Sequence, residues 1–168
     1  MPSLIALVLS IAACVTDLRS RRIPNVLTFG AALAALLFHF VYGGPRGAAI
    51  AALGWLAGCA LFFPPFALGG MGAGDLKLVA ALGAWLGPAD TLWLVLYTGV
   101  AGGILALAVA LARGYLRQAL HNVWVLLAYW RVAGVRPLTE MTLAGGTGPR
   151  LAYGVAIMAG TMVTVWLH

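Results

Sequence analysis

Asp17 and Asp75 are the two side chains of this chain whose type and setting could do chemistry together. Each is a carboxylate beside a long apolar run, where an ionisable group costs several kcal/mol unless it is paired or hydrated. Asp75 follows segment 69–74, in which four of the six residues are glycine. Because glycine costs a helix interior about 1 kcal/mol per residue, we predict a turn or extended strip leading into a helix that begins near Asp75. A tight interhelical turn is the alternative interpretation of these glycines.

The catalytic mechanism of an aspartic protease requires two carboxylates that face one water-accessible pocket. The ionised one takes a proton from water while the protonated one polarises the scissile carbonyl. Since two like charges at close range are not both ionised cheaply, we expect Asp17 and Asp75 to share one proton. This chemistry requires no cofactor and no metal. The alternative for Asp17 is that it only neutralises nearby arginines, for instance through an i, i+4 contact with Arg21.

Histidine and cysteine offer no comparable constellation. His39 and His168 are expected on the outer side of a membrane, and His121 falls in an amphipathic segment, so no nucleophile and base share a plausible depth. Cys14 and Cys59 are isolated in apolar runs without a Cys-x-x-Cys pair. This spacing indicates neither a zinc site nor a disulfide framework.

The composition predicts an all-α, polytopic integral membrane protein. The chain is 63% hydrophobic and only 8% charged, against about a quarter charged in soluble domains. Its formal charge of +6 comes from residues between apolar runs and not from a basic surface stripe. These residues therefore indicate orientation and contact with anionic lipid, and no nucleic-acid partner is expected. Residues 1–168 are expected to form a single membrane-embedded domain.

Six apolar segments are predicted to be transmembrane helices: 2–17, 26–42, 47–68, 75–87, 91–112 and 151–167. The first lacks the basic start of a cleaved signal peptide, so it is expected to be a spanning helix. The fourth is about 20 Å long against a hydrocarbon core of about 30 Å, which places Asp75 within the membrane thickness. Asp17 should lie at a similar depth from the same side.

The basic residues predict the orientation. Nine of the ten fall in connections on one side, and Arg46 is alone on the other: the nine are Arg19, Arg21, Arg22, Lys77, Arg113, Arg117, Arg131, Arg136 and Arg150. Cytoplasmic loops hold such an excess, so both termini are expected outside. Asp17 and Asp75 then share the cytoplasmic side, while Asp90 lies on the far side.

Segment 115–132 is predicted to be an amphipathic helix on the inner leaflet, between the fifth and sixth spans. Its apolar residues recur at helical spacing opposite a polar face, at Leu116, Leu120, Val123 and Leu127. A polar loop with Glu140 follows. The pairs Gly54/Gly58 and Gly99/Gly103 are Gly-x-x-x-Gly patterns, typical of close helix packing.

The segment after Asp17 predicts a helix boundary. Pro24 disfavours helix at Ile23, so the first helix should end nearby. Asn25, a good capping residue, should start the second helix.

Together these motifs resemble the type IV prepilin peptidases, which are Gly-x-Gly-Asp membrane aspartic proteases. The resemblance is carried by Asp17, the following arginines, the sequence Ile-Pro-Asn at 23–25 and the sequence Gly-Ala-Gly-Asp at 72–75. The extension Leu-Lys at 76–77 and the sequence Tyr-Gly-Val-Ala-Ile at 153–157 are similar to the compact CpaA/TadV-like branch, which matures Flp-type pilins.

The resemblance implies a multi-pass endopeptidase of the bacterial inner membrane. It implies that Asp17 and Asp75 are catalytic, that Gly72 and Gly74 shape the substrate-binding site, and that no cofactor takes part. It also implies a single-span prepilin or pseudopilin precursor, cut after glycine at the cytoplasmic face to remove a short basic leader.

Two departures limit the resemblance. The larger bifunctional members have a zinc domain with paired Cys-x-x-Cys motifs, which this chain lacks, so N-methyltransferase activity is not carried over. Ala152 stands where a proline often precedes the last helix. A small proton-coupled transporter or ion-conducting subunit using Asp17 and Asp75 is the alternative function. A structural or assembly subunit, in which these acids only anchor helix ends, is the third.

Overall fold

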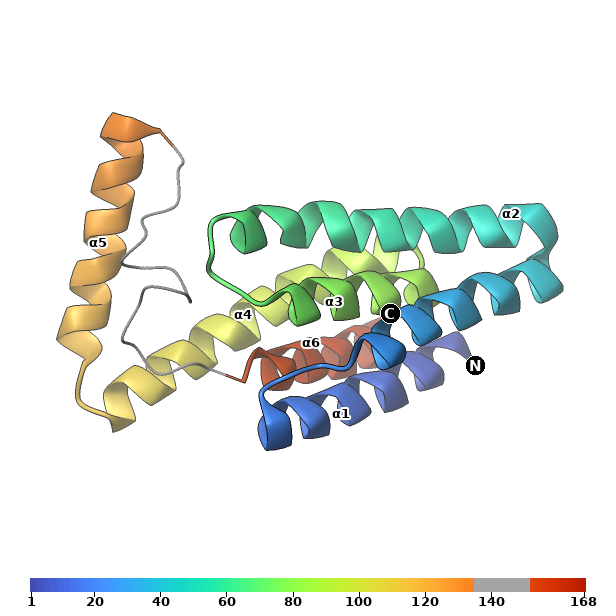
Figure 1. The fold of residues 1–168 in the computed structure, drawn as a ribbon, viewed down its shortest axis with the longest axis horizontal. Helices are drawn as coiled ribbons and strands as arrows, with labels where there is room; N and C mark the ends of the chain where they lie inside the picture. The colour runs from blue at the N-terminus through green and yellow to red at the C-terminus, as the bar shows by residue number, and fades with distance from the viewer. Residues whose placement is uncertain (135–151) are drawn as a thin grey trace.

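The computed structural model describes residues 1–134 and 152–168, in which helices joined by short connections are the regular structure, with no strand in those ranges (Figure 1). The prediction of an all-α fold is thus confirmed for this part of the chain. The predicted polar loop around Glu140 lies outside the described residues. The six helices are α1 (Pro2–Ser20), α2 (Asn25–Ala67), α3 (Ala73–Leu86), α4 (Pro88–Ala112), α5 (Leu116–Ala133) and α6 (Tyr153–Leu167).

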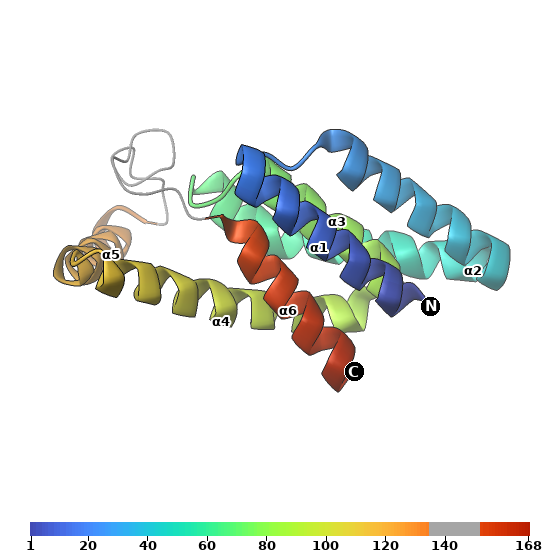
Figure 2. The ribbon, with the colours of Figure 1, turned by 90° about the horizontal axis from the view of Figure 1, so that it is seen from below.

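Helix α2 is a hairpin of two helical arms. Gly44 has φ 61° and ψ −156°, which interrupts the helical path, and Pro45 follows it. The two arms run back from the bend in roughly opposite directions and diverge from each other (Figures 1 and 2). Gly47 closes the hairpin because its missing Cβ leaves room for the backbone of His39. The arms correspond to the second and third predicted apolar segments.

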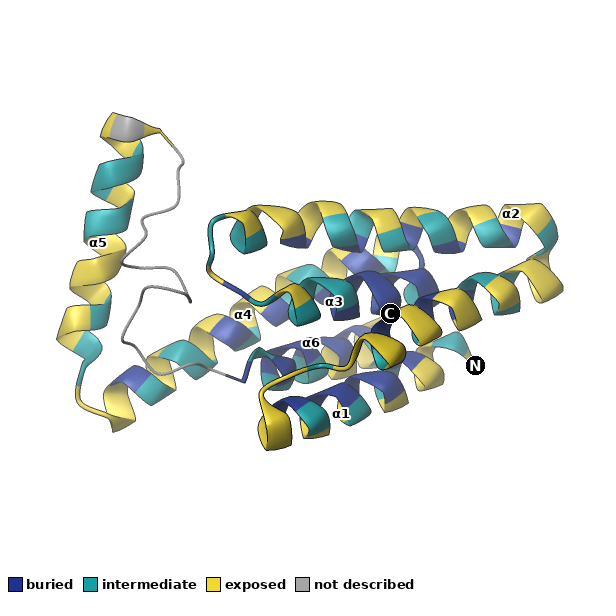
Figure 3. Ribbon diagram, in the orientation of Figure 1, coloured by how far each residue is buried: buried dark blue, intermediate teal, exposed yellow. Residues whose placement is uncertain are grey.

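Within the described residues, three helices are long and apolar enough to cross a membrane, namely α1, α2 and α4. Helix α6 is apolar but shorter, with 15 residues. Much of the outward surface of the bundle is exposed (Figure 3), and it includes large apolar side chains such as Phe29, Leu33, Leu107 and Leu111. An exposed apolar surface of this extent suits contact with lipid.

Helix α3 is the buried centre of the bundle. Its residues from Leu78 to Trp85 are all buried, and α3 packs on both arms of α2 and on α1 and α4. A helix that is apolar around its whole circumference is typical of a protein core or of a membrane span, and α3 is covered by neighbouring helices. With 14 residues, α3 is about 21 Å long, which is shorter than a hydrocarbon core of about 30 Å.

Glycine permits the close approach of α2 to α3. A Cβ on Gly54 would collide with the backbone of Gly83, and a Cβ on Gly58 would lie 2.8 Å from the Cα atom of Ala80. The predicted packing role of the Gly54/Gly58 pair is therefore confirmed.

The same prediction for Gly99 and Gly103 is wrong. Nothing described lies within 4 Å of a Cβ at either position, since both point away from the bundle. The close contact of α4 is made instead by Gly102, where a Cβ would lie 2.6 Å from the Tyr153 hydroxyl oxygen of α6. Adjacent helix positions point about 100° apart, so a spacing pattern alone did not identify which glycine faces the neighbour.

The boundary between α1 and α2 lies where the proline predicts it. Helix α1 ends at Ser20, Arg21 takes a left-handed conformation with φ 53°, and α2 begins at Asn25. The expectation that Asn25 caps this helix is wrong, because Pro24 occupies the N-cap position. The Asn25 side chain instead accepts a hydrogen bond of 2.9 Å from the Lys77 ammonium of α3.

Helix α5 lies apart from the bundle and is steeply inclined to it in Figure 1. Its helical state confirms the predicted helix at 115–132, and its principal neighbour is α4. The side chains of Leu120, Val123 and Leu127 are more than half exposed, so the apolar face predicted for this helix is not covered by the described protein.

Replacing Gly54 with valine should destabilise the bundle. The added side chain must displace the backbone of α3, and overpacking of this kind costs about 1–3 kcal/mol. The matched control is Gly99→Val, also in a helix but with nothing within 4 Å. Thermal unfolding of the purified variants should show a clearly lower midpoint for Gly54→Val than for Gly99→Val. Equal midpoints would contradict the packing described for α2 and α3.

Candidate active site

Three helix ends meet at one end of the bundle: the carboxyl end of α1 and the amino ends of α3 and α6 (Figure 1). Helix α1 contributes Asp17, α3 contributes Asp75, and α6 contributes Tyr153 and Gly154. This convergence brings together residues from the beginning, middle and end of the chain.

Asp17 is held against the start of α6. Its side chain is 8% exposed, and its Oδ2 atom accepts a 3.0 Å hydrogen bond from the Gly154 backbone N–H. The first turn of a helix has N–H groups without helical partners and a partial positive charge, so it stabilises a carboxylate. A Cβ on Gly154 would lie 3.0 Å from the Asp17 side chain, hence glycine is what permits this contact. Asp17 therefore has a partner of its own in α6.

Asp75 is held by the glycine strip that precedes it. Its Oδ2 atom accepts a 3.2 Å hydrogen bond from the backbone N–H of Gly72, the N-cap residue of α3. Gly72 is extended, with φ −80° and ψ 152°, and Gly69 is left-handed, with φ 75°. The prediction of a turn and extended strip leading into a helix is confirmed, although the helix begins at Ala73.

The two aspartates line one pocket of about 320 Å³. The pocket also contains two arginine residues, both glycines predicted to shape the site, and the 23–25 motif. Its lining is Asp17, Arg21, Arg22, Ile23, Pro24, Asn25, Gly72, Gly74 and Asp75.

Gly74 packs against the α1–α2 connection. A Cβ at this position would lie 3.3 Å from the Cβ atom of Ile23, so glycine allows the α1–α2 connection to pack closely on the start of α3. Lys77 strengthens the same junction through its bond to Asn25 and lies 5.1 Å from the Phe29 ring centroid. The two sequence motifs are thus in direct contact.

Tyr153 and Gly154 are the site residues that the sequence reasoning did not assign. Tyr153 is the first residue of α6, directly before Gly154, and its ring lies edge-on to Phe62, with centroids 6.4 Å apart. In the sequence, these residues are marked only by the Tyr-Gly pair at the start of the last apolar segment. This pair does not indicate which residues they contact in the fold.

The remaining titratable candidates lie elsewhere. His39 pairs with the Trp85 carbonyl at 3.3 Å, and His168 stacks on Trp93 with centroids 4.9 Å apart. Asp90 begins α4, beyond the opposite end of α3 from Asp75. Among the described residues, no three His, Cys, Asp or Glu side chains gather as possible metal ligands.

Comparison with protein families gives a match that contains both aspartates. The model of the type IV leader peptidase family matches residues 4–107, which include α2, α3 and most of α1 and α4. Comparisons with curated proteins and with solved structures gave no match. The family match spans more than half of the chain and includes every residue that lines the aspartate pocket. The chain therefore belongs to the type IV leader peptidase family.

Proposed function

We propose that this protein is a membrane aspartic endopeptidase that removes the short basic leader of Flp-like type IV prepilins, cutting after glycine. The observation that carries the proposal is the pocket shared by Asp17 and Asp75, two carboxylates supplied by different helices. Membership of a leader peptidase family supports a prepilin substrate. The pocket then serves as the site of peptide hydrolysis.

The two aspartates act on one water molecule. The ionised carboxylate takes a proton from water as the water oxygen attacks the scissile carbonyl carbon, and the protonated carboxyl donates a hydrogen bond to the carbonyl oxygen. When the tetrahedral intermediate collapses, the C–N bond breaks and a proton passes to the leaving amine. The backbone N–H groups of Gly154 and Gly72 hold the two carboxyl groups in place for both steps.

The glycines support binding of an extended substrate. Helical backbone has its carbonyls hydrogen-bonded, so the bond to be cut must first unwind, and small residues make this cheaper. Gly72 and Gly74 line the pocket without side chains, which leaves room for a second backbone. In this proposal they form the surface against which the scissile segment lies.

The chain is proposed to cross the bacterial inner membrane six times, with the α2 hairpin counted as two spans. Nine of its ten basic residues then lie on the cytoplasmic side together with the aspartate pocket, and both termini lie outside. Helix α5 is proposed to lie on the inner leaflet, its exposed apolar face in contact with lipid and its basic residues near anionic headgroups.

The transporter alternative is less well supported. Both aspartates lie at one end of the bundle, and the buried part of α3 from Leu78 to Trp85 is formed by apolar and glycine residues. A proton path would need ionisable or hydrated groups along this core. Cleavage in vesicles without an ion gradient would distinguish the peptidase from a transporter.

Removing either carboxylate should abolish cleavage. Asp17→Asn and Asp75→Asn each keep the side-chain size but remove the acid–base function, which contributes about 10²–10⁴-fold to rate. Conversion of precursor to mature form should be followed in membranes containing equal amounts of each variant. Asp90→Asn is the matched control, because this aspartate lies away from the pocket, and it should retain most activity. Undiminished cleavage by either of the first two variants would remove the dyad from the proposal.

A bulky residue before the scissile bond should block processing. Replacing the substrate glycine with valine or leucine should hold its backbone away from Gly72 and Gly74, whereas alanine should be partly accepted. The fraction of precursor converted by wild-type membranes measures this directly. Efficient conversion of the valine substrate would show that close backbone approach is not required.

The orientation is tested by fusions to a reporter enzyme that is active only outside the cytoplasm. A fusion after His168 should be active, and one after Gly114, between α4 and α5, should be silent. The expectation follows from the excess of basic residues on one side of the membrane. The reverse pattern would place the aspartate pocket on the wrong side for a cytoplasmic leader.

A further inference from the structure

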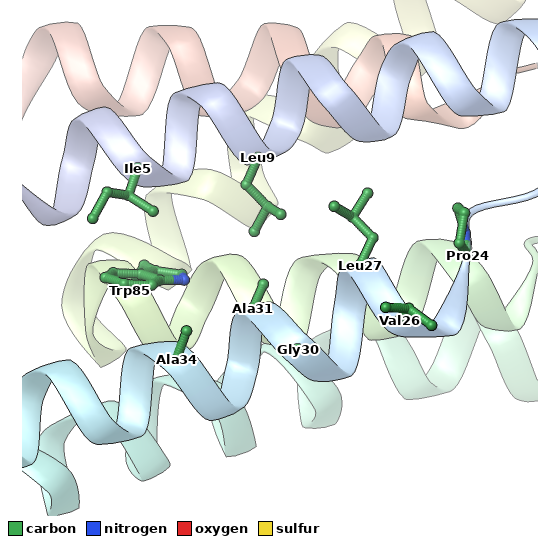
Figure 4. Close-up of a pocket in the computed structure, with 9 residues that line it drawn as sticks. All are labelled: Ile5, Leu9, Pro24, Val26, Leu27, Gly30, Ala31, Ala34 and Trp85. Atoms are coloured by element: carbon green, nitrogen blue, oxygen red, sulfur yellow. The ribbon is translucent and has the colours of Figure 1, made fainter.

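An apolar groove of about 530 Å³ lies between α1 and the first arm of α2, outside the aspartate pocket. Figure 4 shows Ile5 and Leu9 of α1 facing Leu27, Ala31 and Ala34 of α2, with Trp85 of α3 between them. Helices α1 and α2 contact each other sparsely, because each packs mainly on other helices. The groove is therefore a gap between two helices with α3 behind it.

The groove continues from the aspartate pocket. Pro24 lines both of them, and Figure 4 shows it at one end of the groove, with Trp85 toward the other end. Helix α3 connects the two regions, with Asp75 in its first turn and Trp85 near its end. Ten residues of helix separate these positions, which corresponds to about 15 Å. A chain leaving the pocket past Pro24 would thus enter the groove and reach Trp85.

Trp85 presents an unpaired hydrogen-bond donor to the groove. Its side chain is 5% exposed, and its Nε1 atom has no hydrogen-bond partner among the described residues. Figure 4 shows this nitrogen directed along the groove toward its interior. A buried N–H without an acceptor is unfavourable, and such groups are rare in folded proteins. The groove therefore suits an occupant that is apolar but carries one acceptor oxygen.

We infer that the groove binds the apolar segment of the precursor that follows the scissile bond, with an oxygen atom of that segment accepting a hydrogen bond from Trp85 Nε1. The inference rests on the proposed function. In a single-span precursor, the apolar segment directly follows the cleavage junction. With the junction in the aspartate pocket, the apolar segment would therefore reach the adjacent groove. A hydrocarbon tail has no acceptor atom along its length. If the bound segment is helical, its acceptor lies about ten residues beyond the cut.

Gly30 allows the groove to be filled without disturbing the fold. It lies on the groove-facing side of α2, and nothing described lies within 4 Å of a Cβ at this position. Leucine is also the better helix former, so Gly30→Leu should fold normally. Gly103→Leu on α4 is the matched control, since Gly103 is also an exposed helical glycine with open space around it.

Cleavage of a single-span precursor should be measured in vesicles for both variants and the wild type. Gly30→Leu should lower kcat/KM at least tenfold, and Gly103→Leu should match the wild type. Trp85→Phe keeps an aromatic ring but removes the donor, so it should raise KM about fivefold, the effect of one hydrogen bond, with kcat little changed. Trp93→Phe, outside the groove, should change neither value. Wild-type kinetics in Gly30→Leu would overturn the inference while leaving the proposed function intact.

Photocrosslinking tests occupancy independently of activity. A benzophenone amino acid placed at position 30 of the Asp75→Asn variant should crosslink to the precursor, and the same group at position 103 should not. Crosslinking from position 30 to lipid alone would make the groove a lipid site and overturn the inference. Failure of the wild-type enzyme to cleave the precursor would instead contradict the proposed function, so the two failures are distinguishable.

Discussion

The hydrogen bond from the Gly154 N–H to the Asp17 carboxylate is the interaction on which the site depends. A carboxylate this deeply buried must be compensated, and the amino end of α6 supplies both a donor and a favourable dipole. The bond joins the last helix to the first, and Gly102 lets α4 approach Tyr153 of the same helix end. The position of Asp17 is consequently fixed by packing contacts spread over the whole chain.

The short helix α3 fixes the second carboxylate. The helix α3 is surrounded by other helices, and its glycine contacts with α2 set its distance from that helix. Its amino end presents Asp75 to the pocket, while its far end presents Trp85 to the apolar groove. The buried helix α3 thus contributes a residue to both the proposed catalytic pocket and the proposed substrate-binding groove.

Local signals predicted much of this arrangement. Proline and glycine marked the boundaries at Pro24 and in the strip before Asp75, and the apolar runs located the helices. The role of Gly154, the contact of Gly74 with Ile23 and the bond between Asn25 and Lys77 were not predictable in this way. Each of these depends on how distant helices are rotated against one another, which the spacing of residues within one segment does not specify.

The proposed mechanism requires Asp17 and Asp75 to act as one catalytic unit. The decisive measurement is the single-turnover cleavage rate of Asp17→Asn, Asp75→Asn and the double variant, with excess enzyme in vesicles. Residues that act as a unit are strongly non-additive in their effects on rate. Each single variant should therefore be nearly as slow as the double variant. A double variant slowed by the product of the two single effects would show that the carboxylates act independently, and would rule out this mechanism.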